Sequence, residues 1–93
     1  MDGTGSAPIV YDLSRSWTRS WEKVVPEENV YRYYLLSLEQ NLWGEWELIR
    51  RWGRIGKRPT RALLQVVESP DAVEDIAARI DLVRRKRGYV RLE

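Results

Sequence analysis

The sequence contains neither cysteine nor histidine, and these two absences exclude several kinds of chemistry. Without cysteine the chain has no disulfide and no thiol nucleophile, and without histidine it has no imidazole base. Most transition-metal sites in proteins use one or both of these side chains. The remaining carboxylate, lysine, tyrosine and serine side chains show no spacing typical of a catalytic set. We therefore predict a protein that is not an enzyme and that needs no metal or cofactor.

Long apolar runs are missing as well. No run approaches the ~18 consecutive apolar residues that can span a bilayer. The first residues, MDGTGSAPIVYD, have neither the basic start nor the apolar core of a secretion signal. The sequence therefore predicts a soluble, cytoplasmic protein with no membrane partner.

Phenylalanine is absent, whereas tryptophan and tyrosine occur five times each in 93 residues. A chain of this length predicts one domain, and so small a domain buries only about 60% of the surface that its unfolded chain exposes. Tryptophan and tyrosine suit both such a thin core and a half-wet surface, because each ring carries a polar group. Residues 1–16 are rich in glycine, serine and threonine and predict a flexible N-terminal arm, and residues 17–93 a single domain.

The net charge is only +2, but basic residues are concentrated in two segments. Residues 50–61 and 84–91 together hold 11 of the 16 basic residues and none of the 14 acidic residues. The rest of the chain is therefore strongly acidic. Such a distribution predicts one positive surface on an acidic body, as in a protein that binds a polyanion.

Hydrophobic periodicity predicts four strands, which are separated by proline, glycine and asparagine. These strands cover residues 17–25, 30–38, 46–55 and 60–68. Residues 89–93 are a candidate for one more short strand. The layout predicts an α+β fold, in which a small antiparallel sheet of four to five strands packs against one C-terminal helix.

That helix is predicted after residue 69, where the apolar spacing changes from two residues to three or four. Ser69 is a candidate N-cap, Pro70 suits the first helical position, and Gly88 suits the C-terminal end. The face that we expect to be buried consists of Val73, Ile76, Ala77, Ile80 and Val83.

Trp52 stands within the segment RRWGRIGKR, the densest basic cluster of the chain. If this strand is regular, Arg50, Trp52 and Arg54 share one face. The side chain of Trp52 then offers a ring between two cations, as proteins that bind nucleic acids do. Trp46 and Leu48 fall on the same face and are expected to be core residues. Spacing alone leaves open whether Trp52 is a ligand surface or a packed ring covered by arginine stems.

The basic run at residues 84–87 has two interpretations as well. Lysine and arginine at a helix C-terminus complement the helix dipole, typically by about 0.3–1 kcal/mol each. Four in succession exceed what the dipole needs, and they can instead follow a phosphate backbone.

The motif Trp52-Gly53-Arg54, with the strand VYRYYLLSL before it and a helix ending in bases and Gly88-Tyr89 after it, resembles the WGR domain. The resemblance covers about residues 19–90. WGR domains occur in DNA-damage-responsive poly(ADP-ribose) polymerases and in bacterial proteins, including some similar to a molybdate-metabolism regulator. The stand-alone bacterial members are the closer comparison.

The resemblance implies an antiparallel sheet packed against one helix, and binding to broken DNA. It implies that Trp52 meets the sugar of a terminal nucleotide and that Arg54 contacts a phosphate or a protein partner. The sequence departs from the family in one loop, where Lys57-Arg58-Pro59 replaces a frequent Thr-x-Gly turn. By comparison with the stand-alone bacterial members, we expect no polymerase domain that could receive a signal from Arg54.

We therefore predict a module that binds DNA ends, nicks or junctions with little sequence preference. The predicted contact residues are Arg50, Trp52, Gly53, Arg54, Lys57, Arg58, Arg61, Arg84, Arg85, Lys86 and Arg87. One alternative is a protein-interaction domain, because tryptophan, tyrosine and arginine are enriched at interface hot spots. Another is single-stranded RNA binding by the tyrosine-rich strand, which is weakened because Tyr31 and Tyr33 lie on the face opposite to Tyr34.

Overall fold

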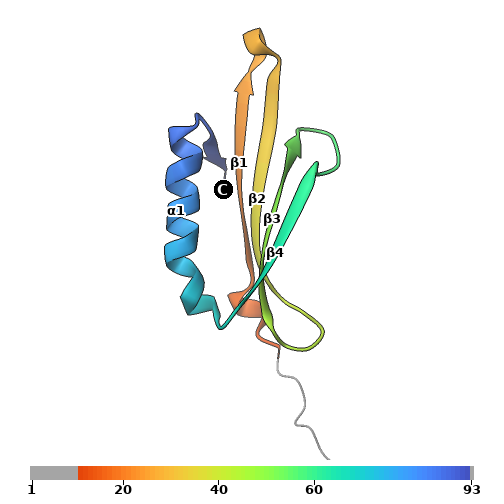
Figure 1. Ribbon diagram of the computed structural model, residues 1–93, viewed down its shortest axis with the longest axis vertical. Helices are drawn as coiled ribbons and strands as arrows, with labels where there is room; N and C mark the ends of the chain where they lie inside the picture. Colours follow the sequence, from red (N-terminus) through yellow and green to blue (C-terminus); the bar gives the residue numbers. More distant parts are fainter. Residues whose placement is uncertain (1–10, 93) are drawn as a thin grey trace, which may run out of the picture.

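A computed structural model describes residues 11–92 of the chain. In it, an antiparallel sheet carries one helix against one of its faces (Figure 1). The strands are β1 (Trp17–Val25), β2 (Val30–Gln40), β3 (Trp46–Arg54), β4 (Arg61–Val67) and β5 (Val90–Leu92), and the helix is α1 (Glu74–Lys86). Their order across the sheet is β4-β3-β2-β1-β5. The predicted α+β class, with an antiparallel sheet and one C-terminal helix, is confirmed.

The turns between the strands form where the sequence predicts them. Pro26 ends β1 and begins the short 3₁₀ helix η2 (Pro26–Glu28), and Asn29 follows in the left-handed conformation, with φ 55°. Between β2 and β3, the side-chain oxygen of Asn41 accepts hydrogen bonds from the backbone N–H groups of Trp43 and Glu45, at 2.9 and 3.0 Å. Asparagine stabilises turns in this way because its side chain mimics a backbone carbonyl. β2 and β3 consequently pair without interruption, from Gln40 opposite Trp46 to Arg32 opposite Arg54.

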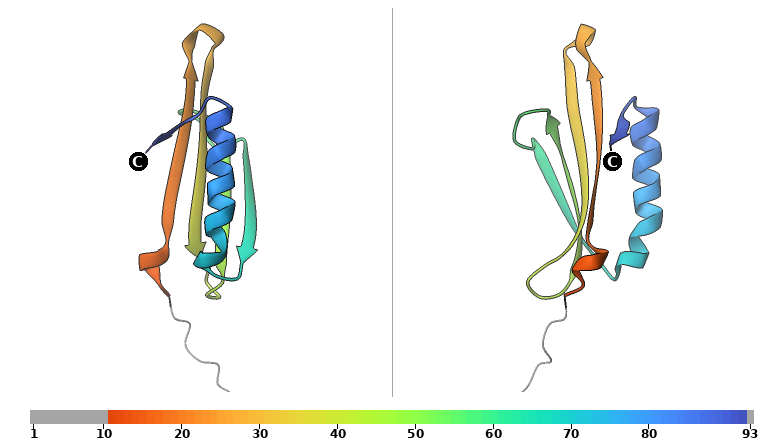
Figure 2. Two further views of the ribbon diagram at one scale, coloured as in Figure 1. Left: turned by 90° about the vertical axis from the view of Figure 1, so that its left-hand side faces the viewer. Right: turned by 180° about the vertical axis from the view of Figure 1, so that it is seen from behind.

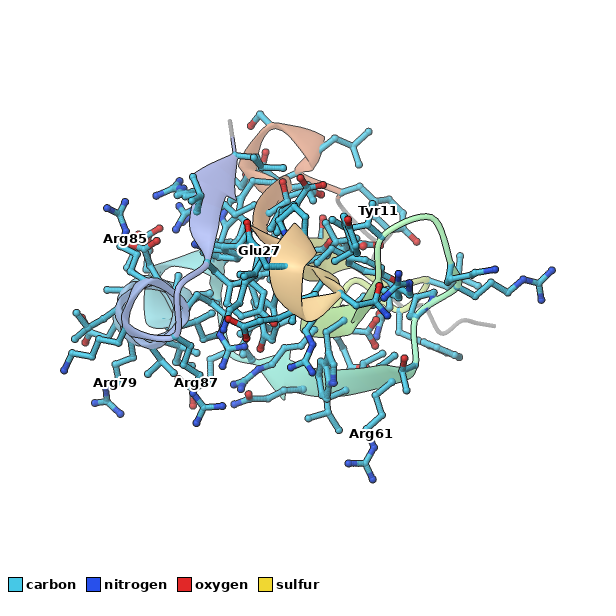
Figure 3. The ribbon with its side chains drawn as sticks, turned by 90° about the horizontal axis from the view of Figure 1, so that it is seen from above. Tyr11, Glu27, Arg61, Arg79, Arg85 and Arg87 are labelled. Carbon is cyan, nitrogen blue, oxygen red and sulfur yellow. The ribbon has the colours of Figure 1, made fainter. Side chains whose placement is uncertain are left out.

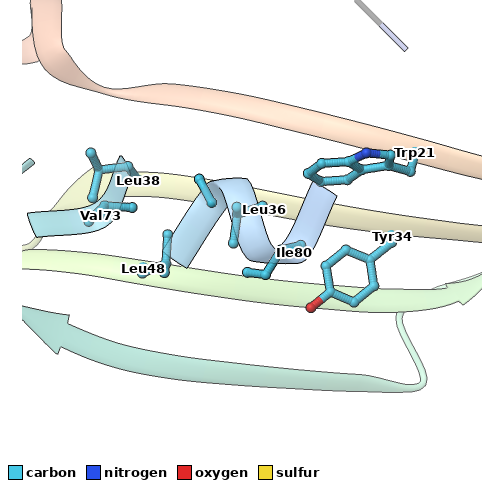
Figure 4. Packing of buried hydrophobic residues seen from close by; sticks show 8 residues of the cluster. Trp21, Tyr34, Leu36, Leu38, Leu48, Val73 and Ile80 are labelled. Atoms are coloured by element: carbon cyan, nitrogen blue, oxygen red, sulfur yellow. The ribbon is translucent and has the colours of Figure 1, made fainter. Parts of the chain in front are cut away.

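The core lies between α1 and the face of the sheet that it covers (Figure 4). Trp21, Leu36, Leu38, Leu48 and Val73 are its largest fully buried side chains. Burying each leucine or valine stabilises the fold by roughly 1.5–3 kcal/mol. Of the predicted helix face, Val73, Ala77 and Ile80 are buried and Ile76 is half-buried, whereas Val83 is 40% exposed. The helix therefore packs along one side of its apolar stripe and leaves the other side open.

The predicted core position of Trp46 is correct only in part. Leu48 is fully buried, but Trp46 is half-buried and packs against the margin of the core. Trp46 pairs with Val67 at the end of β3, whereas Trp21 lies in the middle of β1 and is completely buried. Trp21 is the tryptophan that anchors the core, because its place along the strand puts it beneath the helix.

The start of the helix differs from the prediction. The Ser69 side chain makes no capping hydrogen bond, and residues Pro70–Val73 form a 3₁₀ turn, η3, before the α-helix begins at Glu74. The backbone supplies the closure instead, since the Ala72 N–H donates to the Ser69 carbonyl oxygen at 3.2 Å. At the other end, Gly88 has φ +87° and Tyr89 N–H donates to the Arg84 carbonyl oxygen at 2.9 Å. This is the glycine-ended closure expected of such a helix.

Residues 1–10 of the predicted N-terminal arm lie outside the described part of the chain. Residues 11–16 contain the 3₁₀ helix η1 (Leu13–Arg15) and contact the rest of the domain. The Tyr11 hydroxyl donates to the Leu42 carbonyl oxygen at 2.8 Å, and Arg15 forms an ion pair with Asp71 at 2.7 Å. Within residues 11–92, no helix is long and apolar enough to cross a membrane.

Candidate nucleic-acid interface

Strand pairing aligns the functional candidates in rows across the helix side of the sheet. One row joins Trp21, Tyr34, Trp52 and Arg61 on four neighbouring strands. A second row lies two residues further along each strand, toward the turn between β1 and β2. It joins Lys23, Arg32 and Arg54. Like charges placed directly opposite each other destabilise a sheet. The strand register nevertheless brings three cationic positions into one row across β1, β2 and β3.

Trp52 continues the aromatic row from the core to the surface. Its ring stacks on Tyr34, with centroids 5.8 Å apart and planes 8° from parallel. Tyr34 in turn meets Trp21 edge to face at 5.9 Å. Tyr34 is buried and Trp52 is half-buried. One side of the Trp52 ring is therefore packed, and part of the ring is exposed.

The last turn of α1 brings further cations to this ring. The guanidinium of Arg84 lies 4.5 Å from the ring centre of Tyr34 and 5.1 Å from that of Tyr89. Such contacts between a cation and aromatic rings fix the direction of a side chain that would otherwise be mobile. Arg84 is therefore held beside Trp52.

Trp52 lines three hollows, and we call the side chains of the two that also share Arg84 and Arg87 the Trp52 groove. The groove consists of Lys23, Arg32, Tyr34, Arg50, Trp52, Leu63, Arg84, Arg87 and Tyr89. A further hollow extends it along α1 to Arg79. None of these lining residues is acidic. In the part of the chain that the structure describes, salt bridges involve Arg15, Arg19 and Arg85 and no cation of the groove.

The structure brings some of the predicted site residues together. Arg50, Trp52, Arg84 and Arg87 line one hollow, and Arg61 stands opposite Trp52 on β4. Seen from above, Arg61, Arg79 and Arg87 extend from the same side of the molecule (Figure 3). Arg61 and Arg87 come from the two basic segments of the sequence, whereas Arg79 lies outside both.

Other predicted residues lie apart from the groove. Arg85 extends from the opposite flank of α1 (Figure 3), where it pairs with Asp81 at 2.9 Å. Arg54 is exposed and donates hydrogen bonds to the Asn29 carbonyl oxygen and Oδ1, at 3.3 and 3.1 Å. It lies outside the groove but lines the third hollow together with Trp52 and Gly53. Lys57, Arg58 and Lys86 are exposed and line neither hollow of the groove.

Gly53 has no room for a side chain. It lies on the face opposite to Trp52, and a Cβ atom there would come within 3.1 Å of the Thr60 nitrogen and 3.3 Å of the Arg58 carbonyl oxygen. The loop after β3 therefore folds back onto this glycine, and Thr60 N–H donates to the Trp52 carbonyl oxygen at 2.9 Å. The chain itself thus comes close to Gly53, with Lys57-Arg58-Pro59 forming the loop.

Sequence reasoning missed Lys23, Arg32, Arg79 and Tyr89. Lys23 and Arg32 join the groove through the pairing of β1, β2 and β3, which aligns them with Arg54. The position of Arg79 depends on how α1 is rotated against the sheet.

Asp81 fixes α1 to β1 on the flank away from the groove. Trp21 Nε1–H donates to Asp81 Oδ1 at 2.9 Å, and Arg85 donates to Oδ2 at 2.9 Å. The hydrogen bond from Trp21, followed by the hydrogen bond and charge of Arg85, lowers the pKa of Asp81 despite partial burial, which acts in the opposite direction. Asp81 therefore has a structural role, because both of its carboxylate oxygens accept hydrogen bonds.

Among residues 11–92, no group of three acidic side chains is placed to hold a metal ion.

A fold of one antiparallel sheet and one helix, with a Trp-Gly-Arg strand beside the end of that helix, defines a WGR-type domain. Comparison with protein families agrees, because the model of the WGR domain matches residues 17–93. The chain belongs to the WGR family.

The chain is also similar to a bacterial protein, the uncharacterized protein y4dW of Sinorhizobium fredii. The two are 41% identical over 79 residues, which are 83% of this chain and 37% of that protein. The chain thus corresponds to little more than a third of its relative. No solved structure matches the chain significantly.

Proposed function

We propose that this WGR domain is a non-enzymatic module that binds DNA at ends, nicks or junctions with little sequence preference. The observation that carries the proposal is the Trp52 groove, where five cations and three aromatic rings meet without a carboxylate. A groove of this composition attracts a phosphate backbone, and each phosphate that it neutralises releases counterions.

Trp52 is the candidate for the contact that distinguishes an end from continuous duplex. Its ring is half-buried and held by Tyr34, so that it is ordered before a ligand arrives. A flat ring can lie against a sugar or base only where the helical stack is interrupted, and stacking on an aromatic side chain is worth about 1–3 kcal/mol per base.

The arrangement of α1 supports the lack of sequence preference. η3 and α1 pack along the sheet through Val73, Ala77 and Ile80, and the cations at the C-terminal end of α1 reach the groove. Proteins that read base sequence usually place a helix or ribbon in the major groove. The arginines of this domain are instead arranged around one ring, which suits phosphates at a single locus.

Titration of a matched set of nucleic acids tests the proposal. We suggest fluorescence anisotropy with a closed dumbbell duplex, the same dumbbell with one nick, a blunt duplex, single-stranded DNA and duplex RNA. The nicked and blunt duplexes should bind more tightly than the closed dumbbell, whatever their sequence.

Equal affinity for the nicked and closed dumbbells would remove end recognition and leave a general polyanion binder. No binding of any nucleic acid at low salt would overturn the proposal. In that case a stable partner from a pull-down would favour the interaction-domain alternative.

A further inference from the structure

β4 forms one edge of the sheet, and its outer side has no partner strand within the described residues. β3 pairs with one side of it from Arg61 to Val67. The helix covers the middle of the sheet and leaves this edge free (Figure 2). The backbone N–H and C=O groups on the outer side of β4 are consequently available to another strand.

The side chains of β4 are exposed to an unusual degree for such an apolar strand. Leu63, Leu64 and Val66 are 52, 58 and 53% exposed. Because neighbouring residues alternate, Leu63 lies on the helix side of the sheet and the other two lie on the opposite side. Both faces of the edge are therefore apolar.

Edge strands normally carry a device that prevents pairing with another chain, such as a charged residue, a proline or a bulge. The segment ALLQVV, residues 62–67, contains no charge and no proline, and its register with β3 is continuous. Charges occur only at its two ends, Arg61 and Glu68. This edge is suited to pairing.

We propose that β4 is the interface of a homodimer, in which the β4 strands of two copies pair antiparallel and join two sheets into one. Antiparallel pairing brings the Arg61 end of one strand beside the Glu68 end of the other, so that the ends of the interface carry opposite charges. A parallel arrangement would place like charges together at both ends.

Symmetry and packing also select the register. A two-fold axis within an antiparallel sheet is perpendicular to it, and a residue near the axis then faces its own copy. With Gln65 on the axis, Leu64 faces Val66 of the second copy, and Leu63 faces Val67 of the second copy. Each of these apolar pairs occurs twice, once on each side of the axis. Such cross-strand pairs are the unit that stabilises a sheet.

One consequence rests on the proposed function, although the dimer itself does not. A perpendicular axis leaves both Trp52 grooves on the same side of the joined sheet. From strand geometry they would lie roughly 30 Å apart, if strand twist is ignored. This separation is close to the ~34 Å of one turn of DNA, so that one duplex could reach both grooves.

Sedimentation equilibrium in the absence of nucleic acid tests the dimer. We expect the mass of the unmodified protein to rise from one chain to two as its concentration increases. The variant Leu64→Lys/Val66→Lys should remain monomeric over the same range, because it places four lysines around the axis. The control Val24→Lys/Leu82→Lys changes two side chains of similar exposure, 50 and 53%, elsewhere on the surface and should dimerise normally.

Hydrogen exchange on the unmodified protein gives an independent measurement that needs no variant. The amides on the outer side of β4, within residues 61–67, should exchange more slowly at high protein concentration, and those of the β2–β3 turn should not change. A protein that stays monomeric at all concentrations, or amides of β4 whose exchange does not depend on concentration, would overturn the proposal. A dimer with normal mass in the Leu64→Lys/Val66→Lys variant would overturn it as well. DNA titrations do not enter these outcomes, so the dimer and the proposed function fail separately.

Discussion

At the scale of single residues, Trp21 and Trp52 lie on the same face of the sheet but differ in their surroundings. Trp21 is completely buried and its indole N–H is satisfied by Asp81. Trp52 is half-buried and has one ring face against Tyr34. Only one strand separates the two residues, yet the first is a core residue and the second is partly exposed and is the one that we propose as a ligand contact.

Replacing each tryptophan by alanine should separate these roles. Trp21→Ala should lower the free energy of unfolding by about 3–5 kcal/mol, as truncation of a buried aromatic side chain does. Trp52→Ala should cost clearly less and should abolish the preference for nicked over closed duplex. Urea unfolding and anisotropy titrations measure the two effects. If both variants lose similar stability, Trp52 is a packed ring and the site assignment is wrong.

Asp81 gives a second prediction at this scale, which concerns pH. Its pKa in the folded state lies below the ordinary value of 3.8. The ionised carboxylate therefore stabilises the fold at pH values above about 3.8, and this contribution is lost as the pH falls through the folded pKa.

In Asp81→Asn the amide oxygen can still accept the hydrogen bond from Trp21, but the charge that faces Arg85 is gone. The variant should be less stable than the unmodified protein at neutral pH, and the difference should shrink as the pH falls to about 3. Unfolding in urea at several pH values measures this. A difference that stays constant over this range would show that ionisation of Asp81 contributes nothing.

At the scale of elements, the C-terminal turn of α1 divides its basic run between two surfaces. Arg84 and Arg87 line the Trp52 groove, whereas Arg85 pairs with Asp81 on the other flank. Lys86 is exposed and lines no hollow of the groove. The run therefore serves both to close the helix and to supply the groove, and its members should not be equivalent.

Two double variants of equal charge test this division. Arg84→Gln/Arg87→Gln should weaken binding to every DNA substrate alike, because phosphate contacts carry no end information. It should also reduce the slope of log affinity against log salt by about 2, at ~0.9 per phosphate lost. Arg85→Gln/Lys86→Gln removes the same charge and should leave both quantities nearly unchanged. Equal losses in the two variants would mean that only net charge matters.

The Arg84 change needs a stability measurement beside the titration. Arg84 also packs against Tyr34 and Tyr89, and the loss of these contacts can reduce stability. Thermal melts of both double variants show whether the binding loss occurs in a folded protein.

At the scale of the whole molecule, a net charge of only +2 coexists with a groove that holds five cations and no carboxylate. We expect affinity for duplex DNA to fall steeply with salt, with roughly three to five phosphate contacts at a slope of about −0.9 each. Anisotropy titrations over a series of salt concentrations give the slope. A slope near zero would contradict a phosphate-binding groove.

The sequence by itself determined the elements of this fold. Alternating apolar residues and the turn residues Pro26, Asn41 and Gly44 define the strands, and the change of period after Ser69 defines the helix. These signals are local, because each depends on a few neighbouring positions along the chain. The motif Trp52-Gly53-Arg54, in its order among these elements, was sufficient to indicate the family.

The tertiary structure decided which residues share the groove. Lys23 and Arg32 join Trp52 through the pairing register of three strands, and Arg84 is separated from Arg85 by the rotation of α1 against the sheet. The loop that packs on Gly53 shows in the same way why that glycine is needed. Register, rotation and loop packing arise from contacts between distant parts of the chain, so the local pattern of the sequence could not specify them.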